Sequence, residues 1–386
     1  MSDGDAAPMA RIFLDYQSTT PVDPRVVSAM LPYFTEQFGN PHSVEHSFGI
    51  QAQQAIDRAL ASIADVIGAS AGDIVITSGA TEANNLALRG SLPAGKKAHL
   101  ISAVTEHQSV LGTLAALKDD GHAITLVAVD GDGLVDPEAV EAAIRPATRI
   151  VSVMAVNSEI GVVQPYAELG QLCRSRDVLF HVDAAQGFGR VPLDVKRNCI
   201  DLMSISAHKI YGPKGVGALY VGPAARSRMR AQITGGGQQG GLRAGTMPTP
   251  LIVGFGEAAH LMKEEGATEA TRLAELRTRL WTQLVDRVGG VHLNGSADHR
   301  WVGNLNLRFE DVDADSLMLM APSLALSTGS ACTAGTPEPS KVLRALGLSP
   351  EQASQSVRVG LGRMTTADQI DRAVALIADT VGRLRG

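Results

Sequence analysis

Short apolar runs alternate with helix-forming segments along much of the chain, and this alternation restricts the fold more than any other feature of the sequence. Runs rich in β-branched and aromatic residues predict strands near residues 73–77, 99–104, 124–129, 149–156, 178–183, 201–206 and 217–221. Helical patterns between these strands fall near 108–119, 137–144 and 166–176. Such alternation is typical of parallel sheets with helices on their faces. The expected fold class is therefore α/β, with a doubly wound, mostly parallel seven-stranded sheet.

The rest of the chain predicts a second, smaller domain. A chain of 386 residues, 45% of them hydrophobic, suits one large domain plus a smaller one. We expect residues 1–10 to be a disordered lead, 11–260 the large α/β domain and 261–386 a small α+β domain. A long helix predicted at 250–287 would join the two.

Charge and composition exclude several classes of protein. The net charge is -6 with both signs interspersed, which argues against a nucleic-acid-binding surface. The three cysteines are unclustered, so they suit a reducing compartment rather than a disulfide framework or a metal site. Residues 1–9 lack the features of a signal peptide, and no apolar run is long enough to span a membrane. We expect a cytoplasmic protein without membrane or nucleic-acid partners.

Two predicted strands end beside a carboxylate and an amine. Asp183 closes the run 178–183, and Lys209 follows the run 201–206. Pyridoxal phosphate (PLP) requires such a pair, because a lysine binds it covalently and a carboxylate keeps its pyridine nitrogen protonated. Alone, an aspartate and a lysine would more often be solvated surface groups, so the hypothesis depends on the other strand ends.

The other strand ends supply the remaining groups that PLP requires. Ligands of open α/β sheets bind beyond the carboxyl ends of the strands. Besides Asp183 and Lys209, these positions hold His107, Asn157, Gln186, Ser206 and His208. The segment Ser78-Gly79-Ala80-Thr81 turns at a glycine and starts a helix, whose free N–H groups are suited to a phosphate.

Ten segments in the same order resemble the class V, fold-type I PLP enzymes, and among them the cysteine desulfurases of the NifS/IscS group. The similarity runs from about Phe13 to Thr366. The segments are LDYQSTTPVDP, GNPHS, TSGATEANNLA, TEHQSV, VNSEIGVVQP, HVDAAQ, SAHKIYGPKG, GLRAGT, STGSACTAG and VRVGLGRMTT.

This resemblance implies a role for each matching residue. Lys209 would bind the cofactor covalently, His107 would stack on its ring and move protons, and Cys332 would be the nucleophile. The other implied cofactor contacts are Asp183 at the pyridine nitrogen, Gln186 at the phenolic oxygen, Asn157, and Ala80, Thr81, Ser206 and His208 around the phosphate. Thr246 would reach the phosphate of the other subunit of a homodimer. Asn157 and Arg358 would hold the substrate carboxylate.

The surroundings of Cys332 independently favour a reactive thiol. It lies in a stretch of small residues, with Gly329 and Gly335 on either side and Pro337 beyond, which predicts a flexible, exposed loop. Cys173 and Cys199 lie in apolar or helical surroundings. The alternative is that Cys332 is a tolerated surface cysteine.

The resemblance implies conversion of L-cysteine to L-alanine, with the sulfur left on Cys332 as a persulfide. An iron–sulfur scaffold or another sulfur-acceptor protein would then receive it. The alternatives are a related PLP enzyme, namely a selenocysteine lyase or an aminotransferase, and a non-catalytic sulfur-relay partner. The loop cysteine argues against the aminotransferase.

The glycine-rich loop departs from the family pattern. The resemblance predicts Glu-Arg-Gly where this chain has Gln239-Gly240-Gly241, so an acid and a base are both missing. If the two form an ion pair in the family, losing both at once removes that pair without leaving one charge unpaired. The change is either a compensated structural one or a sign of altered dimer or partner contacts.

Two letter matches carry little weight. The pattern Gly235-x-Gly237-x-x-Gly240 lacks the strand–turn–helix context of a dinucleotide site. His42 to His46 matches a zinc-peptidase motif, but it follows the turn-forming residues Gly39-Asn40-Pro41, and no third ligand is apparent. No metal site is therefore expected.

Overall fold

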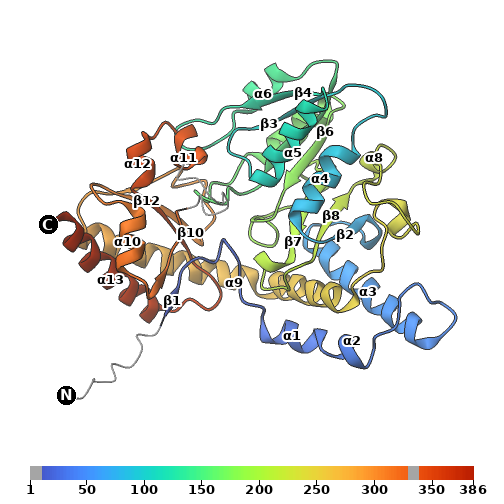
Figure 1. The fold of residues 1–386 in the computed structure, drawn as a ribbon, viewed down its shortest axis with the longest axis horizontal. Coiled ribbons are helices and arrows are strands. Elements are labelled where there is room, and N and C mark those ends of the chain that lie inside the picture. Colours follow the sequence, from blue (N-terminus) through green and yellow to red (C-terminus); the bar gives the residue numbers. More distant parts are fainter. Residues whose placement is uncertain (1–10, 329–338) are drawn as a thin grey trace.

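The central feature of the fold is a seven-stranded sheet. The computed structural model describes residues 11–328 and 339–386 (Figure 1). The strands lie in the order β2-β8-β7-β6-β5-β3-β4. Their bounds are β2 (Ile74–Thr77), β3 (His99–Ala103), β4 (Ala123–Val127), β5 (Thr148–Met154), β6 (Leu179–Asp183), β7 (Leu202–Ser206) and β8 (Gly217–Val221). In this sheet β8 runs in the opposite direction to the other six strands, so the mostly parallel α/β fold is confirmed.

Helices cover both faces of this sheet because alternate strand residues point to opposite sides. Val75 and Leu202 pack toward α4 (Ala80–Gly90) and α5 (Gln108–Asp119), whereas Ile76 and Met203 belong to the core on the other face. That second face is covered by α3 (Ser47–Val66), α6 (Pro137–Ala143), α7 (Tyr166–Ser175) and α9 (Thr249–Arg287). The doubly wound arrangement follows from these two cores.

A smaller sheet lies at the other end of α9 (Figure 1). It has the order β12-β10-β9 and is antiparallel. Its strands are β9 (Val291–Leu293), β10 (Asn304–Phe309) and β12 (Ser356–Gly360), and the nearby helices are α10 (Ala314–Met320), α11 (Lys341–Ala345), α12 (Pro350–Ser354) and α13 (Ala367–Arg385). The predicted boundary at residue 260 falls inside the continuous helix α9.

The N-terminal part of the described chain joins this smaller layer. Strand β1 (Ile12–Phe13) pairs in parallel with β11 (Leu324–Ala325). Two short helices follow, and α1 (Pro24–Met30) ends and α2 (Pro32–Thr35) begins around Leu31. Pro32 has no N–H to continue the first helix, which explains the break. The short helix α8 (Pro223–Arg226) follows β8.

His46, one end of the zinc-peptidase letter match, has a structural role. His46 caps the start of α3, where its Nδ1 accepts a hydrogen bond from the Gly49 N–H at 3.2 Å. Among the helices of the described ranges, none has the length and apolarity needed to cross a bilayer.

Candidate active site

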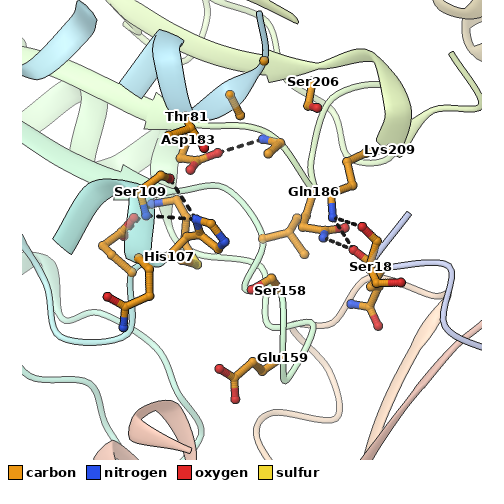
Figure 2. Close-up of a pocket in the computed structure, with 18 of the residues that line it drawn as sticks. Ser18, Thr81, His107, Ser109, Ser158, Glu159, Asp183, Gln186, Ser206 and Lys209 are labelled. Atoms are coloured by element: carbon orange, nitrogen blue, oxygen red, sulfur yellow. Dashed lines mark hydrogen bonds between the residues drawn. The ribbon is translucent and has the colours of Figure 1, made fainter. Parts of the chain in front are cut away.

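A cavity of about 640 Å³ opens at the carboxyl edge of the large sheet. The ends of β3, β5, β6 and β7 and the segment after β2 all contribute to its wall, and the smaller layer closes it with Ser327 and Arg358. Most of the predicted site residues line this one space. They are Ala80, Thr81, His107, Asp183, Gln186, Ser206, His208, Lys209 and Arg358. Figure 2 shows how the strand ends direct most of these side chains toward a common centre.

Asp183 lies at the end of β6, where its carboxylate is held from two sides. Its Oδ2 accepts a hydrogen bond from Asn84 Nδ2 at 2.7 Å, and its Oδ1 accepts one from the Ala185 N–H at 2.9 Å. Asp183 is 5% exposed, so these donors largely replace solvent around the charge. The carboxylate is thereby fixed in place on the cavity wall.

Lys209 follows β7 in a short turn and lies across the cavity from Asp183 (Figure 2). Its Nζ donates hydrogen bonds to the carbonyl oxygens of Gln17 at 2.5 Å and Ser18 at 2.7 Å. Gln186 Nε2 donates to the same Gln17 carbonyl at 2.8 Å. The segment after β1 therefore aligns both the predicted amine and the predicted amide.

His107 has a defined ring orientation because it caps the start of α5. Its Nδ1 accepts a hydrogen bond from the Ser109 N–H at 3.1 Å, and Ser109 Oγ lies 2.8 Å from the same nitrogen. A backbone N–H can only donate, so Nδ1 is the unprotonated nitrogen and a neutral ring carries its proton on Nε2.

Asn84 connects His107 to Asp183. Its Nδ2 donates to Asp183 Oδ2 and also to Ser109 Oγ, at 2.8 Å, which in turn contacts His107. Sequence reasoning did not single out Asn84 or Ser109. The only signals were their positions, one helical turn after Ala80 and two residues after His107.

The segment after β2 forms a cradle for an anion. Gly79 has φ +153°, and a Cβ there would meet only open space. Ala80 and Thr81 begin α4, and the first N–H groups of a helix have no acceptor within the helix. Since the positive end of the helix dipole also points here, the cradle suits a phosphate.

His208 lies at the cavity wall as a neutral side chain. Burial, together with the charges of Lys209, Lys214 and Arg190, lowers the pKa of His208 to about 4. Its Nδ1 lies 3.1 Å from Thr19 Oγ1. His208 therefore offers a neutral hydrogen-bonding group and not a positive charge at neutral pH.

Arg358 brings a guanidinium to the cavity from β12. Its Nη2 donates to Asp15 Oδ1 at 2.7 Å and its Nη1 donates to the Ser158 carbonyl at 2.8 Å. Its buried Nε has no hydrogen-bond partner within the described residues. A buried donor without a partner costs free energy, which a bound carboxylate would recover.

Three predicted site residues stand apart from this group. Asn157 is 1% exposed, and its side chain bonds to backbone groups of Thr105, Glu159 and Ile160, so it lies beside the cavity without lining it. Thr246 is exposed and does not line the cavity of its own chain. Cys332 lies outside the described residues.

Neither of the other cysteines is placed at the cavity. Cys173 is fully buried in α7, and burial raises the pKa of its thiol to about 12. Cys199 comes shortly before β7, at the amino edge of the sheet, whereas the cavity lies at the carboxyl edge. By contrast, Ser327 and Pro339, the cavity-lining residues on either side of the segment that carries Cys332, place its two flanks at the cavity.

The residues present fit PLP. The cradle at α4 suits its phosphate, the Asp183 carboxylate suits a pyridinium nitrogen, and Lys209 supplies an amine for covalent attachment. The His107 ring lies between Ser109 and the cavity (Figure 2), where it can stack on a bound ring.

Comparison with known proteins gives a consistent result. The model of the aminotransferase class-V family matches residues 12–373. The cysteine desulfurase IscS of Rickettsia typhi is 50% identical over 376 residues, which cover 97% of this chain and 92% of that protein. The protein of the same name from Rickettsia bellii is also 50% identical, with the same coverage.

Solved structures agree with these relatives. A NifS-like protein superposes with a TM-score of 0.90 at 31% identity, covering 97% of this chain and 100% of its own. SspA in complex with cysteine superposes with a TM-score of 0.82 at 37% identity, covering 91% and 98% of the two chains.

Proposed function

The chain belongs to the aminotransferase class-V family, and from that premise we propose that it is a PLP-dependent cysteine desulfurase. It converts L-cysteine to L-alanine and retains the sulfur as a persulfide. The observation that carries this proposal is the meeting of Lys209, Asp183 and His107 in one cavity whose wall also includes Ser327 and Pro339. Those two residues flank the segment that contains Cys332.

The cofactor would supply an electron sink that weakens the bonds at Cα and Cβ of the bound amino acid. Arg358 orients the substrate by its carboxylate, with Nε added to the donors that already hold Asp15 and Ser158. Asn157 supports this end of the cavity through the turn that it stabilises. Lys209 would hold the cofactor, and its amine is placed at the cavity where it would carry the Cα proton.

His107 and Cys332 complete the reaction. The Sγ of Cys332 forms a bond to the substrate sulfur as the substrate Cβ–S bond breaks, and Cβ takes up a proton to give alanine. The protonated Nε2 of His107 can serve as an acid at the cavity. The reactive form of Cys332 is the thiolate, because a thiol is a poor nucleophile. The persulfide then passes to a sulfur acceptor such as an iron–sulfur scaffold, in a reducing compartment such as the cytoplasm.

A homodimer is part of this proposal. Apolar side chains are exposed around α1 to α3, among them Leu31 at 58%, Phe34 at 54%, Phe38 at 66% and Val44 at 67%. Such a patch supports a contact with another copy of the chain. Thr246 is exposed outside its own cavity, which supports its contact with the phosphate of the other subunit.

Release of alanine and sulfide from L-cysteine tests the activity. Purified protein loaded with PLP, with a reducing thiol present, should form the two products in equal amounts. Alanine without sulfide, or transfer of the amino group to a keto acid, would contradict the proposal and favour an aminotransferase.

Mixing of variants tests the contact across the dimer. Thr246→Ala protomers mixed with Lys209→Ala protomers should regain part of the activity, because one site of the mixed dimer keeps both wild-type residues. No recovery despite demonstrated subunit exchange would place Thr246 in its own subunit.

A further inference from the structure

Gln239 satisfies the open edge of strand β2. This strand is at the end of the large sheet, and among the described strands it pairs only with β8. In an antiparallel pair, alternate residues direct their N–H and C=O away from the partner strand. Ile76 is such a residue, since Gln239 Oε1 accepts a hydrogen bond from its N–H at 2.6 Å and Gln239 Nε2 donates to its carbonyl at 3.0 Å. The Gln239 amide thus makes the two hydrogen bonds to Ile76 that a neighbouring strand would otherwise make.

The glycine-rich loop that carries Gln239 also contacts the other side of the phosphate cradle. Arg243 Nε donates to Glu82 Oε1 at 2.9 Å, within an ion pair in which both side chains are largely buried. The other carboxylate oxygen of Glu82 accepts a hydrogen bond from the Ser78 N–H at 2.8 Å. The loop is therefore bonded to Ile76, which precedes the cradle in the sequence, and to Glu82, which follows it.

The two hydrogen bonds between position 239 and Ile76, one accepted and one donated, are those of an amide side chain. Ile76 presents one donor and one acceptor, and Gln239 Nε2 also lies 3.4 Å from the Arg243 carbonyl. A carboxylate can accept from the Ile76 N–H, but its other oxygen would face two carbonyl oxygens. The family pattern has an acid here, followed by a base. In this chain Gly240 has φ +66°, a conformation that a larger residue adopts only with strain.

We propose that Gln239 is a positioning residue for the phosphate cradle, which it holds by fastening the glycine-rich loop to the edge of β2. The loss of the acid and the base that the family pattern has here is then a compensated change, in which two hydrogen bonds between Gln239 and the Ile76 backbone fasten the loop. The inference rests on the proposed function, because the cradle's ligand is the phosphate of the PLP that this function requires.

Two substitutions of the same kind in adjacent residues test the proposal. Gln239→Glu removes the donor to Ile76, whereas Gln238→Glu keeps an oxygen to accept the hydrogen bond from the Gly245 N–H, which is 3.0 Å from Gln238 Oε1. Both variants add one negative charge to the loop. The measurement is the rate at which each holo-protein loses its PLP to an excess of a second PLP-binding apoprotein.

We expect Gln239→Glu to release PLP at least about fivefold faster than the wild type, and Gln238→Glu to stay within about twofold of it. Equal release rates for the two variants would overturn the proposal, whether both are slow or both are fast. If Gln239→Glu does not fold, hydrogen exchange of the Ile76 amide in wild-type holo-protein decides the matter. Protection supports the bond to Gln239, and rapid exchange overturns it.

The tests separate this inference from the proposed function. Wild-type protein that retains no PLP would overturn both. An active desulfurase in which Gln239→Glu releases PLP as slowly as Gln238→Glu would overturn the positioning role alone.

Discussion

Arg190 fixes the orientation of Gln186 by donating a hydrogen bond from Nη1 to the amide oxygen across 2.8 Å. A guanidinium has only donors, so the oxygen must face it and the Nε2 group is directed toward Gln17. Arg190 Nη2 also donates to the carbonyl of Lys209, and the guanidinium stacks on the Trp301 ring, 4.3 Å from its centroid. One cation from outside the predicted site thus orients two of its members.

Substitution of Arg190 should alter the spectrum of the bound cofactor. Arg190→Met leaves the Gln186 amide free to turn, so the Nε2 group that would contact the cofactor's phenolic oxygen is no longer fixed in orientation. We expect a changed pH titration of the visible absorption band, with an intermediate effect for Arg190→Lys, which keeps the charge but loses the two-pronged geometry. An unchanged titration in Arg190→Met would show that Gln186 needs no such support.

Ser109→Ala should slow turnover without weakening substrate binding. The substitution removes the hydroxyl that links Asn84 to His107 Nδ1, while the backbone N–H at 109 still holds that nitrogen. We expect kcat to fall about threefold to tenfold with a shifted pH profile and a nearly constant KM. Ser109→Thr retains a hydroxyl and is the matched control. A change in KM alone would place the role of Ser109 in binding.

Arg358→Ala should mainly impair the binding of L-cysteine. The guanidinium is largely buried at the cavity, and its Nε has no hydrogen-bond partner among residues 11–328 and 339–386. We expect the KM for cysteine to rise about tenfold to a hundredfold, with PLP retained. Since the variant also leaves Asp15 without its partner, Asp15→Asn is examined in parallel, and it should bind cysteine better than Arg358→Ala does. Loss of PLP with unchanged cysteine binding would contradict the assignment.

Cys332→Ser should bind PLP and L-cysteine but release no sulfide. The hydroxyl cannot take up the substrate sulfur, so turnover is expected to fall by at least about a hundredfold. Cys199→Ser is the control and should keep normal activity, because Cys199 lies at the opposite edge of the sheet. Full sulfide release by Cys332→Ser would require another nucleophile.

Buried histidines should make the protein sensitive to acid. Burial lowers the pKa values of His99, His181 and His208 to about 4 from the ordinary 6.5. The stability that these neutral histidines contribute to the folded protein is fully present above pH 6.5. It is lost as the pH falls toward 4, because the histidines of the unfolded chain take up protons first. Each proton taken up on unfolding lowers the free energy of unfolding by about 1.4 kcal/mol per pH unit.

The dependence of the free energy of unfolding on pH can be compared in two variants. His181 lies between Ser152 Oγ at 2.8 Å and Ser204 Oγ at 2.9 Å in the sheet core. Denaturant unfolding between pH 7 and pH 4.5 should show a shallower loss of stability for His181→Gln than for the exposed-site control His260→Gln. Parallel curves for both would mean that His181 does not take up a proton on unfolding.

The sequence was sufficient to predict which residues at strand ends meet at one edge of the sheet. Asp183, Lys209 and His107 follow directly from apolar runs, and parallel strands bring their carboxyl ends to one edge. Strands β9 and β11 are three and two residues long, too short for a sequence pattern to be recognised.

The residues that hold the site residues in place could not be predicted in the same way. Asn84 lies inside a helix, and Arg190 lies in a turn beyond the strand end, so neither position marks a ligand. Gln239 bonds to a residue 163 positions away, and no local preference encodes such a pairing. Tertiary packing alone brings these side chains together.

The pairing of β1 with β11 bears on how the chain can fold during its synthesis. Ile12 leaves the ribosome early, but its partner Leu324 is made only after about 310 more residues. At ordinary rates of translation this is a wait of roughly 15 to 60 s. The large sheet, β2 to β8, is made long before then, but Gln17 and Ser18, whose carbonyls hold Lys209, lie in the segment after β1 and depend on its placement. Closure of the catalytic cavity by the smaller layer is therefore a late step of folding, and a nascent chain that stops before β11 would present an open cavity.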